Sequence, residues 1–133
     1  MTRENVEVAL ECFRRFDAAD LGPFAELLHP HVRMTAAEGW PEQGPFQGRD
    51  ASIRQFERLF GDWSEYSLED VRVVRDAGEW VVVAWTMRAR GRGSGLDVAM
   101  DVVGALRVED GQVIEAHYRW SPEAAFEAAG LAP

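Results

Sequence analysis

The chain has 133 residues, a length that suits a single domain over residues 1–133 with a core of its own. Its formal net charge of −9 argues against binding to nucleic acids or anionic membranes, because both need a basic surface. No apolar run approaches the ~20 residues that span a bilayer, and the N-terminus lacks the apolar core of a secretion signal. We therefore expect a cytoplasmic protein, and its single cysteine, Cys12, excludes an internal disulfide.

The first part of the chain predicts three helices and one short strand. Apolar residues recur at helical spacing over residues 6–16 and predict the first helix. A second helix is expected after Asp20, which suits an N-cap, with Pro23 in its first turn. Residues 31–36 alternate weakly and predict a strand, and the apolar residues within 53–60 mark a third helix.

The segment between that strand and the third helix reads AAEGWPEQGPFQG, residues 36–48. Its glycines and prolines predict a loop. The loop nevertheless carries two large aromatic residues, Trp40 and Phe46, and a carboxylate, Glu38, close to the tryptophan. Such a combination raises the question of what a loop does with an aromatic side chain beside an acid.

The second part of the chain predicts four strands and a final helix. Four runs rich in valine and aromatic residues are separated by the turn sequences DAG, GRGSG and EDG, which indicate hairpins. Over residues 121–131, Ser121 suits an N-cap, Pro122 a first helical position and Gly130 a C-terminal stop. Helices followed by strands predict an α+β fold with helices on one face of the sheet.

The last two strands show which residues should face the helices. In the final strand the apolar set is Ile114, Ala116, Tyr118 and Trp120, and in the preceding strand it is Leu96, Val98, Met100, Val102 and Leu106. A two-residue turn at 110–111 would pair residue 104 with 117. The apolar residues of one strand would then lie on the same face as the polar residues of the other. A three-residue loop, 109–111, pairs 104 with 116 and aligns the apolar sets, so we predict this loop with a bulge at Gly111.

The strand over residues 79–90 differs from the others because both of its faces are apolar. Trp80, Val82 and Ala84 form the face opposite the one expected to meet the helices. A strand that is apolar on both faces is normally buried on both. Since the predicted helices cover one face, we expect a second copy of the chain to cover the other in a twofold homodimer.

Several of these segments together resemble the NTF2-like superfamily, in its SnoaL-like branch, over essentially the whole chain. They are ENVEVALECFRRFDAADLGPFAELLHPHVRM, WPEQGPFQGRDASIRQF, GRGSGLDVAM, RVEDGQVIEAHYRW and EAAGL. The resemblance implies a cone in which a curved, mostly antiparallel sheet wraps around three N-terminal helices, with a pocket inside and a short C-terminal helix. The family includes polyketide cyclases, ketosteroid isomerases and non-catalytic binding proteins, so the fold alone does not assign a reaction.

The resemblance also implies roles for particular residues. It places the loop at the mouth of the cone, where Trp40 either covers a ligand or simply plugs the open end, and Glu38 is the nearest carboxylate. Ketosteroid isomerases use a tyrosine, a base and a protonated acid, and Cys12, Ala36 and Gly104 stand at those positions here, so all three roles are lost. Glu38 is a candidate displaced base, or an ordinary solvated loop carboxylate.

We expect a wide apolar pocket for a small, flat hydrophobic molecule. Its expected polar group is the Tyr118 hydroxyl, which could orient a ligand oxygen or could simply pack in the core. The other expected lining residues are Cys12, Met34, Trp40, Phe56, Trp85, Met87, Met100, Val102, Gly104 and Trp120. No motif indicates a metal or a cofactor.

Two hypotheses follow from this pocket. One is a cyclase or isomerase that uses Glu38 as general base and Tyr118 as oxyanion donor. The other is a non-catalytic ligand-binding or dimerisation protein of the same fold.

Overall fold

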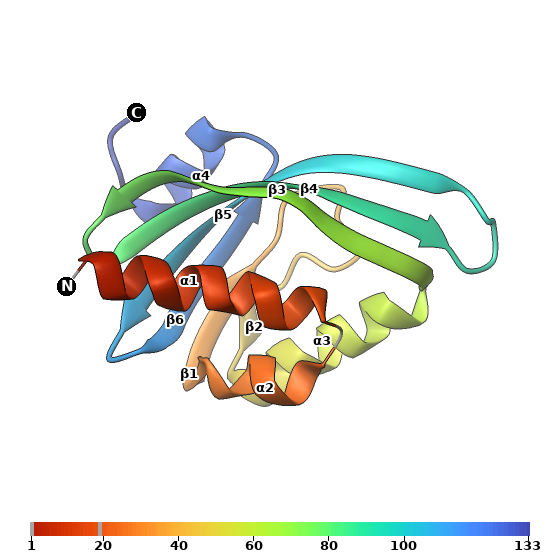
Figure 1. The fold of residues 1–133 in the computed structure, drawn as a ribbon, viewed down its shortest axis with the longest axis horizontal. Coiled ribbons are helices and arrows are strands. Elements are labelled where there is room, and N and C mark those ends of the chain that lie inside the picture. The colour runs from red at the N-terminus through yellow and green to blue at the C-terminus, as the bar shows by residue number, and fades with distance from the viewer. Residues whose placement is uncertain (1, 19) are drawn as a thin grey trace.

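The computed structural model describes residues 2–18 and 20–133 and arranges them as a strongly curved sheet with helices on both faces (Figure 1). In chain order the elements are α1 (Thr2–Asp17), α2 (Leu21–Glu26), β1 (Leu28–Thr35), β2 (Phe46–Gln47), α3 (Arg49–Gly61), β3 (Trp63–Ala77), β4 (Trp80–Gly91), β5 (Asp97–Glu109), β6 (Gln112–Arg119) and α4 (Pro122–Ala129). The strands form a 6-stranded sheet in the order β2-β1-β6-β5-β4-β3. Neighbours are antiparallel except β1 and β6, which run parallel. The predicted α+β class is confirmed.

The helix boundaries follow the capping signals in the sequence. The Asp20 carboxylate accepts a hydrogen bond from the backbone N–H of Gly22 at 3.2 Å and starts α2. Ser121 caps α4 in the same way, at 3.2 Å from a backbone N–H of its first turn. Gly130 ends α4 in the left-handed conformation that glycine tolerates best.

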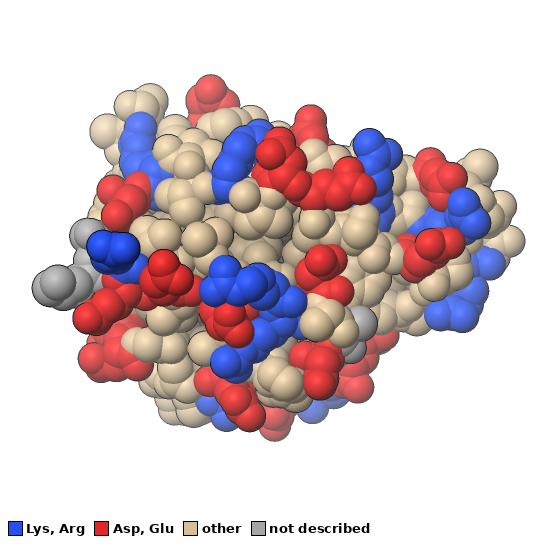
Figure 2. Space-filling model, in the orientation of Figure 1, with Lys and Arg blue, Asp and Glu red and all other residues tan. Residues whose placement is uncertain are grey.

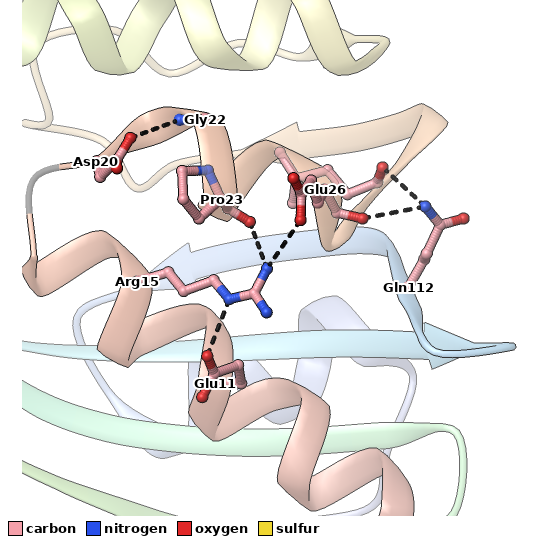
Figure 3. Close-up of polar contacts among 8 residues, drawn as sticks. Glu11, Arg15, Asp20, Gly22, Pro23, Glu26 and Gln112 are labelled. Atoms are coloured by element: carbon pink, nitrogen blue, oxygen red, sulfur yellow. Dashed lines mark hydrogen bonds and ion pairs between the residues drawn. The ribbon is translucent and has the colours of Figure 1, made fainter.

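Helix α2 has only six residues and is held in place by polar contacts on both sides (Figure 3). Arg15 of α1 donates hydrogen bonds to the Pro23 carbonyl at 2.6 Å and to the Glu11 carboxylate at 2.9 Å. At the other end of α2, the Gln112 side chain donates to the Glu26 carbonyl at 3.3 Å. A helix this short is not stable alone, so these contacts and its packing fix its position.

The β5–β6 hairpin aligns its apolar faces by a device other than the predicted one. Asp110 and Gly111 both have positive φ, 51° and 79°, and form a two-residue turn instead of a three-residue loop. Val108 of β5 pairs with Val113 of β6, whereas Arg107 pairs with Glu115. Ile114 therefore has no partner in β5 and is an extra residue in β6. This bulge shifts the register by one residue, so the two apolar sets face the same side after all.

The bulge also changes which residues are inside. Val113, not the predicted Ile114, packs in the interior core together with Ala116. Gly104 pairs with Tyr118 instead of residue 116, and the predicted register is therefore wrong by two residues although its facing is correct.

Strand β4 is buried on both faces, as predicted, but a different element covers the second one. Its inner face contributes Val81, Val83, Trp85 and Met87 to the core cluster that also holds residues of α1, α2 and α3. On the outer face, Val82 and Ala84 pack with Ala125 and Phe126 of α4, and Trp80 lies at the edge of this cluster. The C-terminal helix of the same chain therefore takes the place that we assigned to a second copy.

This arrangement corrects the expected dimer contact. Val82 has no exposed surface within the single chain, so it cannot form an interface with another copy. A homodimer stays a prediction, but the two-sided apolar pattern of β4 no longer requires one.

The charged surface is mixed. On the side shown in Figure 2, arginines and acidic residues alternate without a large area of one sign. The exposed ion pairs of the protein include Arg88–Glu69 and Arg90–Asp97. Within residues 2–18 and 20–133, no helix has the length and apolar character needed to cross a bilayer.

The cover provided by α4 predicts the effect of truncating its anchor. Phe126 is buried and its ring also lies 4.0 Å from the Arg75 guanidinium carbon. Phe126→Ala should lower the free energy of unfolding by about 3 kcal/mol, because it leaves a cavity against the outer face. Glu127→Ala, an exposed change in the same helix, should alter it by less than about 0.5 kcal/mol. Denaturant unfolding of both variants tests this, and equal midpoints would show that α4 adds little to the outer face.

Candidate functional site

A cavity lies between the inner face of the sheet and the helices α1 and α3. Its volume is about 50 Å³, which is room for only a few water-sized molecules. Five phenylalanines fill much of the interior, namely Phe13, Phe16, Phe24, Phe46 and Phe56. The cavity is therefore apolar, as predicted, but narrow where we expected it to be wide.

The lining carries no ionised side chain. Among the described residues, no Asp, Glu, His, Lys or Arg lines the cavity, and its polar side chains are Cys12, Thr35, Gln55, Trp85 and Tyr118. Burial raises the pKa of the Cys12 thiol to about 12. Burial also raises the pKa of Tyr118, and the nearby Cys12 adds to this effect. Both groups are consequently neutral at pH 7, and so is the cavity.

Gly104, which we expected among the lining residues, lies behind two aromatic side chains. A Cβ atom at this position would lie 3.1 Å from the Tyr118 ring and 3.2 Å from the Trp85 ring. These two rings meet edge to face, with centroids 5.9 Å apart. The glycine therefore does not enlarge the cavity, because the space of its missing side chain is occupied by the two aromatic walls.

Trp85 carries a polar atom without a partner. Its indole N–H is the one enclosed side-chain donor that makes no hydrogen bond among the described residues. Its known neighbours are aromatic, with the Phe13 ring centroid at 4.6 Å and Tyr118 on another side. Buried N–H groups are nearly always paired, so an enclosed indole N–H without a hydrogen-bond partner is an unusual feature of this interior.

The loop over residues 36–45 forms one wall of the cavity and is held by hydrogen bonds from residues outside the loop. Trp40 lines the cavity, and its ring centroid lies 5.5 Å from that of Trp120. The Trp120 indole N–H donates a hydrogen bond to the Glu38 carbonyl at 2.8 Å. Arg58 of α3 holds the Glu42 carboxylate through two hydrogen bonds of 2.8 and 2.7 Å, which lower the pKa of Glu42. The loop is thus an ordered part of the wall.

Comparison with known families identifies this architecture. The sequence profile of the SnoaL-like domain matches residues 9–116, which is most of the chain. The protein belongs to the SnoaL-like family. No curated protein matches it significantly by sequence.

Solved structures of other proteins share the fold of this SnoaL-like protein over nearly its whole length. An NTF2-like protein of unknown function from Burkholderia pseudomallei is 22% identical, with a TM-score of 0.79 over 93% of this chain and 95% of that chain. TerC, crystallised with polyporic acid, is 20% identical, with a TM-score of 0.78 over 93% and 96%. A protein of ketosteroid isomerase-like fold from Catenulispora acidiphila, in complex with trimethylamine, is 13% identical, with a TM-score of 0.75 over 95% and 94%. At these identities the likeness shows the fold, and the predicted NTF2-like resemblance is confirmed.

Eight of the residues that we expected in the lining lie around the cavity of this SnoaL-like protein. Those that line it are Cys12, Met34, Trp40, Phe56, Trp85, Met87, Val102 and Tyr118. Met100 packs at the edge of the core, and Gly104 lies behind the aromatic walls. Trp120 is 41% exposed and holds the loop from outside.

Glu38 lies in the loop outside the cavity wall. Its side chain is exposed and is not part of the cavity wall, and only its backbone carbonyl takes part in the loop structure. Its assignment as a base stays a prediction to which the geometry adds nothing.

Sequence reasoning missed Gln55, the polar residue that α3 places in the cavity. It is 4% exposed and lies on the same face of α3 as the buried Ser52, Phe56 and Leu59. The signal was available, because a glutamine inside an apolar helical stripe is a buried polar residue that needs an explanation.

A second polar cluster of the SnoaL-like domain lies on the outer face of the sheet. His117 is buried, with its Nδ1 2.7 Å from the Thr35 hydroxyl and its Nε2 3.1 Å from the Glu115 carboxylate. Arg107 donates to the same carboxylate at 3.2 Å, and the Trp80 ring stacks on the imidazole with centroids 5.9 Å apart. Since a carboxylate only accepts, Nε2 carries the proton and Nδ1 accepts from Thr35. The cluster joins β1 to β6 and is internally satisfied.

The Trp120 contact predicts a change in loop mobility. Trp120→Phe removes the hydrogen bond to the Glu38 carbonyl but keeps an aromatic ring beside Trp40. Amide exchange over residues 36–45 should accelerate roughly fivefold, because one hydrogen bond that holds the loop is lost. Trp63→Phe, at a tryptophan whose ring packs on Tyr66, should leave exchange in the loop unchanged. Unaltered protection in Trp120→Phe would mean that the bond does not hold the loop.

The buried imidazole predicts a pH dependence of stability. Burial lowers the pKa of His117 below its ordinary value of 6.5, although Glu115 opposes this and Arg119 and Arg33 add to it. Below that value the unfolded chain takes up a proton that the folded protein resists, so stability should fall as the pH decreases from 7.5 to 5.5. His117→Gln should show a smaller decrease in denaturant unfolding at the two pH values. Equal decreases in both proteins would place the titration elsewhere.

Proposed function

We propose that this SnoaL-like protein binds a small, neutral, mostly apolar molecule in its interior cavity. The observation that carries the proposal is the absence of any ionised side chain among the described residues that line the cavity. Transfer of a charged ligand into such surroundings, without a partner of opposite charge, would be strongly unfavourable. A neutral molecule loses much less hydration and gains contacts with the aromatic walls.

The same observation favours binding over acid–base catalysis. A cyclase or isomerase of this type needs a group that removes a proton near pH 7. The Glu38 side chain is exposed and lies outside the cavity wall. The raised pKa values of Cys12 and Tyr118 keep both groups protonated near pH 7, so neither can accept a proton there. Of the two hypotheses from the sequence, the non-catalytic ligand-binding protein is the better supported.

The cavity volume limits the ligand. About 50 Å³ is far below the ~300 Å³ typical of pockets for drug-sized molecules. A single-ring compound, entering with adjustment of the surrounding phenylalanines and the loop, fits this cavity better than a larger flat molecule does. Two proteins of the same fold were crystallised with small molecules, trimethylamine and polyporic acid, which supports small-molecule binding as a use of this fold.

Charge discrimination tests the proposed function. Acetophenone should bind at pH 7.5 and quench or shift the tryptophan fluorescence, because Trp40 and Trp85 line the cavity. Benzoate and benzylammonium, of similar size but charged, should bind at least about a hundredfold more weakly.

Two variants of one strand supply the control. Val102→Phe fills the cavity and should abolish acetophenone binding, whereas Val98→Phe changes an exposed position of the same strand and should not. Benzoate affinity equal to that of acetophenone, or full binding by a folded Val102→Phe protein, would overturn the proposal.

A further inference from the structure

Gln55 is a polar side chain in the cavity wall, and packing alone does not explain why a glutamine stands there. It is 4% exposed, and its carboxamide makes no hydrogen bond in the described part of the chain. Its neighbour on the same helix face, Ser52, is satisfied by the Gly48 carbonyl at 2.9 Å. Phe56 and Leu59 complete an otherwise apolar face. A buried amide without a partner destabilises the folded protein, and a methionine of similar length would fill the same space without this cost.

The Gln55 side chain forms part of the cavity wall. Trp85 holds the one fully enclosed side-chain polar atom that lacks a partner among the described residues, so the polar atoms of Gln55 are not fully enclosed. Gln55 lines the cavity and is 4% exposed. A ligand in the cavity would therefore lie beside this side chain.

We propose that Gln55 is the polar recognition group of the cavity and that the ligand presents a hydrogen-bond donor and an acceptor side by side. The inference rests on the proposed function, because it concerns the ligand of the same cavity. A carboxamide offers an acceptor oxygen next to a donor N–H₂, and a complementary pair on a ligand satisfies both at once. Primary amides, lactams and hydroxy ketones have this pair and are neutral, as the cavity requires.

Specificity follows from the apolar surroundings of this amide. A site that hydrogen-bonds a ligand group rejects the analogue without that group, because its own buried polar atoms are then left unpaired. The phenylalanine-rich walls accept any ring of the right size, so the discrimination between similar rings falls to Gln55.

Three neutral probes with one common ring test the proposal. Benzamide presents a donor and an acceptor side by side, acetophenone replaces the N–H₂ by a methyl group and keeps the acceptor, and toluene has neither. Their dissociation constants are measured for the full chain, for Gln55→Met and for Leu59→Met. Leu59→Met is the matched control, because it changes another buried position of the same helix face that also lines the cavity.

Gln55→Met should weaken benzamide binding about tenfold relative to acetophenone, with toluene binding unchanged or stronger. Leu59→Met should leave the ratio of benzamide to acetophenone affinity as it is in the original chain. Gln55→Met should also raise the melting temperature, because an unpaired buried amide is replaced by an apolar chain of similar length. A purely structural glutamine would instead make this variant less stable.

The outcomes separate this inference from the proposed function. Binding of toluene and acetophenone with no change of the benzamide ratio in Gln55→Met would overturn the role of Gln55 and leave the apolar binding cavity intact. Failure of all three compounds to bind up to their solubility would overturn both. A lower melting temperature for Gln55→Met would show that its carboxamide has a partner inside the protein, and would also reject the role.

Discussion

Burial of β4 on both faces is the constraint around which the molecule is organised. Its inner residues, such as Trp85 and Met87, need a helical layer, and its outer residues, such as Val82, need another. The N-terminal helices provide the first layer and α4 provides the second, after the chain has crossed the sheet (Figure 1). The cavity wall formed by β4 is therefore backed by a packed cluster and is a rigid surface against which a ligand can be positioned.

The strand β6 separates two chemically different environments. Successive residues of a strand point to opposite faces, so Tyr118 enters the cavity and His117 joins the outer cluster. The titratable groups Glu115 and His117 are paired with each other outside, and the interior keeps only neutral polar atoms. The sheet thus keeps ionisable chemistry away from the site where a ligand would lie. This distribution of charged and neutral groups between the two faces is the feature on which the proposed binding function rests.

Features set by local interactions could be predicted from the sequence. The caps at Asp20, Ser121 and Gly130 depend on a few neighbouring residues, and the facing of β5 and β6 depends on alternation. The bulge at Ile114 could not be predicted, because a longer turn and a bulge both align the apolar faces.

Features set by tertiary packing were harder to predict. The apolar residues of α4 were visible, but the face that they cover is decided by the whole chain. The same applies to Gly104, whose missing side chain is replaced by two rings from other strands. The aromatic stripe of α1 predicted a core, and only the packed structure shows that Phe13 and Phe16 narrow the cavity. Gln55 could have been singled out, since a polar residue in an apolar stripe is visible in the sequence.

The parallel pairing of β1 with β6 determines when during folding the cavity can form. Thr35 and His117 bond across 82 residues of sequence, and β1 otherwise pairs only with the two residues of β2. Contacts between such distant segments cost loop-closure entropy before they return any stability, and they slow folding. During synthesis β1 keeps an open edge until the last strand has emerged. The cavity wall that these strands share is accordingly completed late, and until then the unpaired edge of β1 is open to wrong strand pairing.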